Sequence, residues 1–181
     1  MVSSTKRFYE NGFECVTRNG TRRIPYSDVS AIYYLDQTVK QTVILIPIVS
    51  QRNVCLELKT YTYGDEKFKE QAGGVYGMGS DNARALEQVR DIIVDRVVTR
   101  MRNEIAERGR TCWANDVFFT ESSIIQGDIC IPYEEITDIG WNRLLFTVTI
   151  KGSRGMPIKL KTHFNLLPAI IILGEKGVAL S

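Results

Sequence analysis

The hydrophobic pattern is clearest between residues 80 and 109, where apolar side chains recur every three or four residues. This period matches one face of an α-helix. Ser80 or Asp81 would cap the start, and Gly109 would close the end. The sequence therefore predicts one long amphipathic helix, which we expect to pack along the flanking sheets. Its main apolar positions are Leu86, Val89, Ile93, Val97, Met101 and Ile105.

On both sides of this helix the pattern changes to short runs rich in Val, Ile, Leu and Tyr, which are typical of β-strands. A second helix is expected to begin near Phe164 or Asn165 and to end at Gly174. Each half is thus interpreted as a short antiparallel meander followed by a helix. The strand candidates are 13–17, 29–34, 42–49 and 54–60 in the first half and 123–125, 136–141, 144–150 and 156–161 in the second.

A sequence echo relates the two halves. Ile24-Pro25-Tyr26-Ser27-Asp28-Val29 matches Ile131-Pro132-Tyr133-Glu134-Glu135-Ile136 in its Ile, Pro, Tyr, acidic and final apolar positions. Proline disfavours helical backbone before it and removes a donor, so a strand should end at each Ile-Pro step. We interpret the echo as a duplicated structural corner with Asp28 or Glu135 in the bend. A ligand-binding role for these acids is the alternative.

The segment Thr60–Gly79 is polar and rich in glycine, and it is predicted to be the least constrained part of the chain. Its glycines, from Gly73 to Gly79, precede the long helix, where backbone N–H groups could hold a phosphate. The Gly-Lys-Ser/Thr ending of a P-loop is absent. We therefore expect a mobile connection that could serve as a binding loop.

Composition narrows the function classes. The apolar fraction of 44% and the charged fraction of 24% indicate a globular protein, and a net charge of +2 gives no basic footprint for nucleic acid. The N-terminus is polar and not followed by an apolar signal region, so a cytoplasmic location is expected. The four cysteines form no C-x-x-C pair, which predicts free, buried thiols and no zinc site.

No catalytic centre, cofactor site or metal site is recognisable. His163 is the single histidine, and no Ser or Cys partner lies near it in sequence. The neighbouring carboxylates Glu134 and Glu135 should point apart, which argues against a shared acid/base site. An enzyme is therefore the weakest hypothesis, with His163 as its best candidate residue.

Two groups of side chains are candidates for binding a partner. Arginines around an expected β-hairpin turn could hold an anionic group, although a solvated turn explains them equally simply. Exposed tyrosines suit a protein interface. The arginines are Arg18, Arg22 and Arg23, and the tyrosines are Tyr61, Tyr63 and Tyr76.

The order of motifs resembles an uncharacterised bacterial family with two pleckstrin-homology-like (PH-like) halves flanking a long helix. The resemblance rests on Tyr9-Glu10-Asn11-Gly12-Phe13, the two Ile-Pro-Tyr corners and His163-Phe164-Asn165-Leu166-Leu167. The chain departs from the pattern at Glu121-Ser122-Ser123-Ile124, where a glycine-containing turn is expected. The resemblance implies a PH-like β-sandwich or barrel capped by helix, and it supplies no activity.

The sequence thus predicts an α+β fold with a first PH-like half at 1–79, the long helix at 80–109 and a second half at 110–181, packed as one unit. The expected function is a non-enzymatic binding or adaptor module that recognises a protein partner. The alternatives are a toxin-neutralising, immunity-type protein and a module for anionic lipid headgroups. Homo-oligomerisation is left open.

Overall fold

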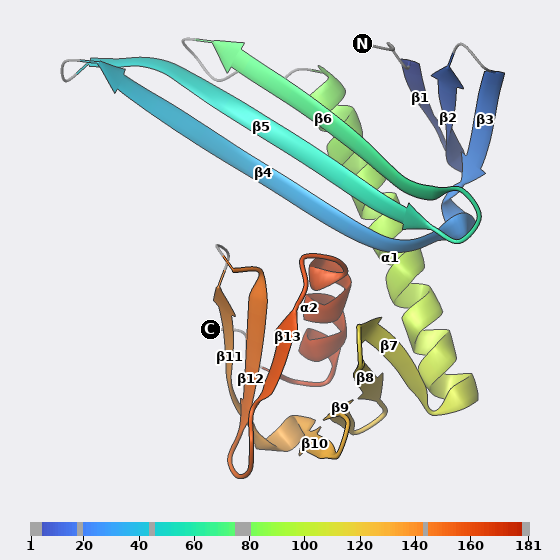
Figure 1. The fold of residues 1–181 in the computed structure, drawn as a ribbon, viewed down its shortest axis with the longest axis vertical. Coiled ribbons are helices and arrows are strands. Elements are labelled where there is room, and N and C mark those ends of the chain that lie inside the picture. The colour runs from blue at the N-terminus through green and yellow to red at the C-terminus, as the bar shows by residue number, and fades with distance from the viewer. Residues whose placement is uncertain (1–4, 18–19, 44–45, 75–80, 143–144, 179–181) are drawn as a thin grey trace. The chain divides into compact units, whose positions relative to one another are not determined.

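The computed structural model describes residues 5–17, 20–43, 46–74, 81–142 and 145–178 (Figure 1). The chain divides into two compact units, Met1–Arg96 and Val97–Ser181. The division falls inside the long helix α1 (Asp81–Arg108), so each unit contains part of this helix. Both units consist of antiparallel meanders and helix, which confirms the α+β class.

Unit 1 contains two three-stranded antiparallel sheets. Large apolar side chains from both sheets are fully buried, among them Phe13, Ile24 and Leu56. Leu86 and Ile93 of α1 are buried as well. The strands are β1 (Thr5–Tyr9), β2 (Gly12–Thr17), β3 (Gly20–Pro25), β4 (Val29–Val43), β5 (Ile46–Thr60) and β6 (Gly64–Gly74).

Unit 2 contains a four-stranded sheet, a three-stranded sheet and a second helix. Phe119, Ile124 and Ile150 are among its fully buried side chains, as is Met101 of α1. The strands are β7 (Arg110–Ala114), β8 (Val117–Thr120), β9 (Ser123–Gln126), β10 (Ile129–Pro132), β11 (Ile136–Asn142), β12 (Thr147–Gly152) and β13 (Ile158–Lys161), and the helix is α2 (Leu166–Glu175).

The long helix is confirmed within one residue at its C-terminal end. Gly109 has a φ of 75°, and its N–H donates to the carbonyl of Ile105 at 2.9 Å, as expected for a glycine that closes a helix. The predicted apolar positions of this helix are all buried. Among the described residues, no helix is long and apolar enough to cross a membrane.

The expected loop between residues 60 and 79 is wrong over much of its length. Residues 64–74 form β6, which pairs with β5 from Thr60↔Gly64 to Ser50↔Gly74. The strand was hard to recognise because its outward positions are charged and Phe68 is its one large apolar residue. Tyr76 and the glycines at 77 and 79 lie outside the described residues.

The three strands predicted at 29–34, 42–49 and 54–60 are two long strands in the structure, β4 and β5. β4 and β5 pair continuously from Val29↔Thr60 to Val43↔Ile46, with a register shift near each end. The apolar window 42–49 therefore lies at the far end of this hairpin, where residues 44 and 45 are not described. The sequence lacks a strong turn signal between residues 34 and 42, and β4 continues through this segment.

The Ile-Pro-Tyr corner of unit 1 forms a short 3₁₀ helix, η1 (Tyr26–Asp28). The Tyr26 N–H donates to the carbonyl of Asn11 at 3.0 Å, and the Asp28 carbonyl accepts from the Tyr61 N–H at 3.0 Å. The Tyr26 side chain is buried. The corner thereby links the β1–β2 turn to the β5–β6 turn.

The corner of unit 2 repeats these contacts. In η2 (Tyr133–Glu135), the Tyr133 N–H donates to the carbonyl of Ser122 at 3.0 Å, and the Glu135 carbonyl accepts from the Ser153 N–H at 2.8 Å. Tyr133 is buried like its counterpart. The predicted bend after each Ile-Pro step is confirmed, with Asp28 and Glu135 at the same position.

The equivalence of the two units continues into the strand after each corner. The register shifts between Val29 and Ala31 in β4 and between Ile136 and Asp138 in β11. At the residue after the corner's apolar position, a hydroxyl side chain donates across the ladder to a lysine carbonyl. The pairs are Ser30 Oγ to Lys59 O at 3.1 Å and Thr137 Oγ1 to Lys151 O at 3.2 Å.

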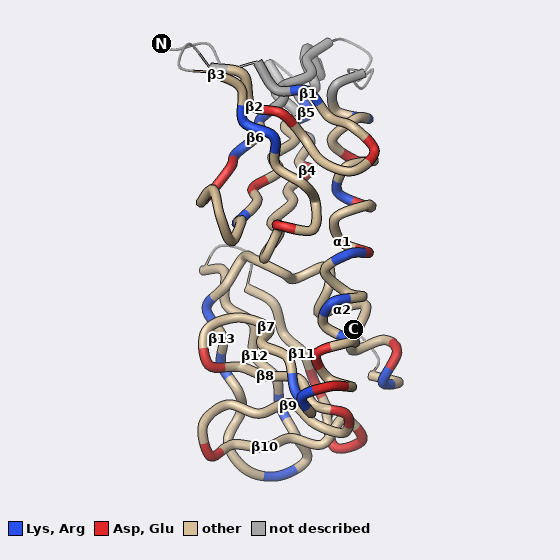
Figure 2. Tube along the Cα trace, turned by 90° about the vertical axis from the view of Figure 1, so that its right-hand side faces the viewer, with Lys and Arg blue, Asp and Glu red and all other residues tan. Residues whose placement is uncertain are grey.

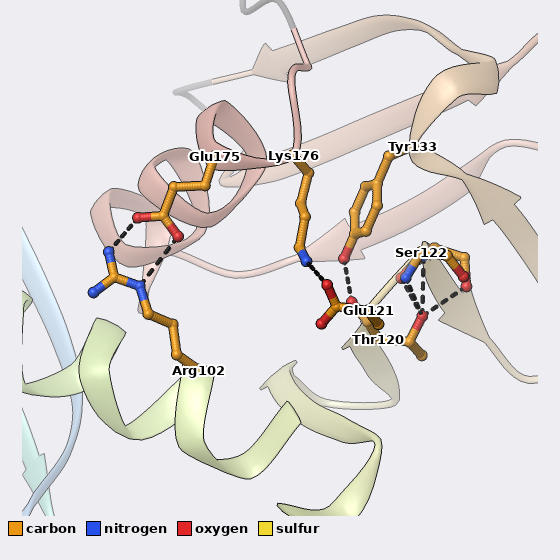
Figure 3. Close-up of polar contacts among 8 residues, drawn as sticks. Arg102, Thr120, Glu121, Ser122, Tyr133, Glu175 and Lys176 are labelled. Carbon is orange, nitrogen blue, oxygen red and sulfur yellow. Dashed lines mark hydrogen bonds and ion pairs between the residues drawn. The ribbon is translucent and has the colours of Figure 1, made fainter. Parts of the chain in front are cut away.

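Thr120 shapes the turn where the sequence lacks the expected glycine. Its Oγ1 accepts from the N–H groups of Ser122 and Ser123 at 3.3 and 3.0 Å (Figure 3). The Thr120 carbonyl accepts from the buried Tyr133 hydroxyl at 2.8 Å. A hydroxyl that satisfies the turn's backbone donors thus replaces the conformational freedom of glycine.

Ion pairs hold the C-terminal end of α2 within unit 2 (Figure 3). The Arg102 guanidinium of α1 contacts both carboxylate oxygens of Glu175, with Nε to Oε2 at 3.1 Å. This guanidinium lowers the pKa of Glu175. Lys176 Nζ donates to Glu121 Oε1 at 2.7 Å.

The two buried corner tyrosines give a matched stability test. Tyr133→Phe removes a hydrogen bond and leaves the Thr120 carbonyl without it, so the free energy of unfolding should fall by about 1 kcal/mol. Tyr26→Phe should be neutral or stabilising, because the Tyr26 hydroxyl has no hydrogen-bond partner among the described residues. Urea unfolding of both variants measures the difference. Equal losses would contradict the assignment.

Candidate functional site

The β5–β6 turn of unit 1 is held by a set of hydrogen bonds to η1. The two Asp28 carboxylate oxygens accept from Thr62, with Oγ1 at 2.8 Å and the backbone N–H at 3.2 Å. Thr60 Oγ1 donates to the Gly64 carbonyl at 2.9 Å and accepts from the Tyr63 N–H at 2.9 Å. The turn is therefore held by Asp28 of η1 at its centre and by Thr60, the last residue of β5, across its base.

This fixed turn presents two tyrosines to solvent, and we call Tyr61 and Tyr63 the tyrosine turn. Their side chains are 65% and 40% exposed. A tyrosine offers a large amphipathic ring with few torsions to order, so little conformational entropy is lost on binding. A rigid backbone beneath the two rings lowers this cost further. Two of the three predicted tyrosines thus lie on one turn, and the third, Tyr76, is outside the described residues.

The equivalent turn of unit 2 has the same anchor and different side chains. Ser153 Oγ donates to Glu135 Oε2 at 3.2 Å, in the place of the Thr62–Asp28 contact. The exposed side chains near this turn include Arg154 and Met156, and Met156 is 70% exposed. Aromatic presentation is therefore a property of the turn in unit 1 and not of the shared scaffold.

The structure does not bring Arg22 and Arg23 together. They are neighbours on β3, so their side chains leave opposite faces of the sheet. Arg22 Nη2 pairs with Glu66 at 3.1 Å, and Arg23 Nε pairs with Glu14 at 2.5 Å. Arg18, the third predicted arginine, lies outside the described residues.

The carboxylates that bind these arginines were missed in the sequence. Glu14 and Glu66 are only 6% and 8% exposed. Charged residues are rarely this buried unless they are paired, as both of these are. Glu66 Oε2 also accepts from the buried Cys15 Sγ at 3.5 Å. One signal for Glu14 was present, because it interrupts the apolar run from Phe13 to Val16.

The Glu14 carboxylate is held by two side-chain hydrogen bonds. The Tyr9 hydroxyl donates to its Oε2 at 2.8 Å, and Arg23 binds its Oε1. The hydrogen bond from Tyr9, followed by that from Arg23, lowers the pKa of Glu14. The Glu14 carboxylate is therefore ionised at neutral pH and its oxygens are engaged within the unit.

A hollow of about 390 Å³ lies along β2 and β3 next to this carboxylate. Gly12 is required in its wall, because a Cβ there would lie 2.4 Å from the Ile24 carbonyl oxygen. The polar side chains at its edge already have partners: Tyr9 and Arg23 bind Glu14, and Asn11 Oδ1 accepts from Arg96 at 3.4 Å. The lining residues are Tyr9, Asn11, Gly12, Phe13, Glu14, Arg23, Ile24 and Pro25.

The residues considered for catalysis or metal binding lie apart. His163 contacts the rings of Phe146 and Phe164, with centroids at 5.3 and 4.4 Å. In the described ranges, no group of three His, Cys, Asp or Glu side chains is placed to hold a metal ion. The expectation that all four cysteines are buried holds only for Cys15, because Cys55 is half-buried and Cys112 and Cys130 are exposed. None of the four, all of which lie in the described residues, forms a disulfide.

Comparisons of the chain with protein-family models, with curated proteins and with solved structures find no match. The candidate surface therefore rests on the geometry of the two units.

Removing the Asp28 carboxylate should loosen the tyrosine turn. Asp28→Ala deletes both hydrogen bonds to Thr62, so the free energy of unfolding should fall by about 1 kcal/mol and the Thr62 amide should exchange faster with solvent. Amide hydrogen exchange by NMR measures this. Asp65→Ala, at an exposed carboxylate of β6, is the control and should leave Thr62 protected.

Glu14 should contribute to acid sensitivity. Its pKa is lowered by folding, so its stabilising contribution is present above the ordinary glutamate pKa of about 4.3 and is lost as the pH falls through the folded value. Glu14→Gln should be less stable than wild type at pH 7 and lose less stability on acidification. Urea unfolding from pH 7 to pH 3 measures both slopes, and parallel slopes would contradict the role.

Proposed function

We propose that this chain is a non-enzymatic binding or adaptor module that recognises a protein partner through the tyrosine turn. The observation that carries the proposal is the exposure of Tyr61 and Tyr63 on a turn held by Asp28 and Thr60. Tyrosine is enriched at protein interfaces, and rigid aromatic side chains often supply much of the binding energy there.

The proposed scaffold is a duplicated PH-like domain. In support, each unit has two successive antiparallel meanders joined by an Ile-Pro-Tyr corner and followed by a helix. The matching 3₁₀ turns, register shifts and ladder contacts support a common origin of the two units. Fold alone does not fix function, so the surface residues carry the functional argument.

The two alternatives draw different support from the same geometry. An anionic lipid headgroup needs converging cations, whereas Arg22 and Arg23 diverge and are each paired with a buried carboxylate. An immunity-type protein is a special case of protein binding, with a toxin as the partner.

In the proposal the protein acts in the bacterial cytoplasm, where exposed free thiols such as Cys112 and Cys130 stay reduced.

Site-specific photo-crosslinking in the native host tests the proposal. A photoreactive phenylalanine analogue at Tyr61 should give a covalent adduct with one protein. The matched probe at Met156, on the equivalent turn of unit 2, should not give this adduct. The captured partner, once purified, should bind Tyr61→Ser, Tyr63→Ser at least about tenfold more weakly than wild type, because two interface tyrosines are removed. Isothermal titration calorimetry measures the affinities.

Three outcomes would overturn the proposal. These are the same adduct from both probes, no adduct from either, or a partner that binds the double variant as tightly as wild type. Sedimentation with anionic vesicles distinguishes the lipid alternative. Vesicle binding by wild type without an adduct at Tyr61 would favour a headgroup module.

A further inference from the structure

The outer face of the sheet β11–β12–β13 in unit 2 is an open, shallow hollow of about 590 Å³. Val148 and Ile150 of β12 are buried, and alternation along the strand turns their neighbours to the outer face. Gly140 has no side chain, and a Cβ there would meet no atom within 4 Å, so the face stays open. Residues lining it include Asp138, Gly140, Asn142, Thr147, Thr149 and Lys151.

Two further lysines border this hollow on β13. Lys159 pairs across the ladder with Thr149, and Lys161 pairs with Thr147. Both lysines are exposed and alternate with buried residues, so both ammonium groups lie on the outer face. Figure 2 shows the basic positions of β13 in blue.

The carboxylates near this face have other partners. Asp138 pairs with Lys151 at 2.8 Å, and Asp116 on the β7–β8 turn accepts from Gln126 Nε2 at 3.1 Å. Within the described part of the chain, neither Lys159 nor Lys161 forms an ion pair. The face therefore carries two cationic groups that no carboxylate of the described residues neutralises.

The equivalent face of unit 1 carries larger side chains and an ion pair at the matching positions. Lys59 and Lys151 are equivalent, because each carbonyl accepts the ladder hydroxyl after its corner. Two residues before Lys59 stands Glu57, which forms an ion pair with Lys67 of β6. Tyr33 of β4 lies opposite Glu57.

Unit 2 has smaller and neutral residues at these places. Thr149 replaces the glutamate, Gly140 replaces the tyrosine, and Lys159 remains as the cation. The place of a tyrosine and a glutamate–lysine ion pair in unit 1 is thus taken in unit 2 by a glycine, a threonine and a lysine without an ion pair. This difference between two copies of one scaffold points to a ligand that supplies the missing carboxylates.

We propose that the lysine face, formed by Lys159, Lys161 and the hollow beside them, binds an extended acidic segment of a protein partner. Lys159 and Lys161 are two residues apart on one strand, so their Cα atoms are separated by roughly 7 Å. An extended segment with acidic residues at alternate positions presents carboxylates at the same spacing. The threonine hydroxyls in the hollow add donors and acceptors for such a segment.

The inference rests on the proposed protein-binding function but uses a separate surface, so it is tested without the tyrosine turn. The probe is a fluorescent peptide of alternating Glu and Thr, and fluorescence anisotropy measures its binding. A peptide of equal composition with Glu and Thr in pairs is the spacing control. The alternating peptide should bind at least about fivefold more tightly, and its affinity should fall with added salt.

Two variants locate the site. Lys159→Gln, Lys161→Gln removes the cations, and Thr149→Glu supplies an internal carboxylate for Lys159 as Glu57 does for Lys67. Each should weaken binding of the alternating peptide by about fivefold or more. Arg84→Gln, Arg108→Gln changes the net charge equally on exposed positions of α1 and should bind like wild type.

The controls separate this inference from the proposed function. Tyr61→Ser, Tyr63→Ser should bind the peptide like wild type, since the tyrosine turn is not part of the lysine face. The inference is overturned if Lys159→Gln, Lys161→Gln keeps full affinity, if the arginine variant loses as much, or if both peptides bind alike. Binding to phosphatidylserine vesicles in place of the peptide would also overturn it, in favour of a membrane surface.

Discussion

The buried tyrosine of the Ile-Pro-Tyr corner is the contact on which each unit depends. Proline stops the preceding strand, and the next residues form one turn of 3₁₀ helix that reverses the chain. With its side chain buried, the tyrosine fixes this turn relative to the core, and its N–H and the following acid's carbonyl bind two separate hairpin turns. Each corner thus binds the turns of two hairpins, one before it and one after it in the chain, and fixes the position of their four strands.

The corner also positions the hairpin tip whose residues differ between the two units. The acid that ends each 3₁₀ turn holds the far hairpin through its carboxylate, as Asp28 does with Thr62 and Glu135 with Ser153. Because the backbone is fixed by the corner, residues at the tip of that hairpin are free to change. Tyrosines fill this place in unit 1, while Arg154 and Met156 fill it in unit 2.

Local signals in the sequence predicted the parts of the fold that depend on them. The period of apolar residues located α1, and the Pro-Tyr steps located both corners, because these features act over a few neighbouring residues. β6 was missed because its pairing with β5 is set by tertiary contacts of Glu66 and Phe68, while its sequence is polar. The arginines are recognisable because they cluster in the sequence. Their buried carboxylate partners were missed because the pairs form through tertiary contacts.

Charge pairing gives the two units different surfaces on one scaffold. In unit 1 the buried Glu14 and Glu66 bind the arginines of β3, and Glu57 binds Lys67, so these cations are neutralised within the unit. A surface whose charges are paired in this way favours recognition by shape and aromatic contact, as proposed for the tyrosine turn. In unit 2 a threonine stands in the place of Glu57, so Lys159 has no internal carboxylate partner among the described residues and can pair with a carboxylate of a ligand. The two proposed surfaces belong to one chain, so a partner that contacts both would bind more tightly than through either surface alone.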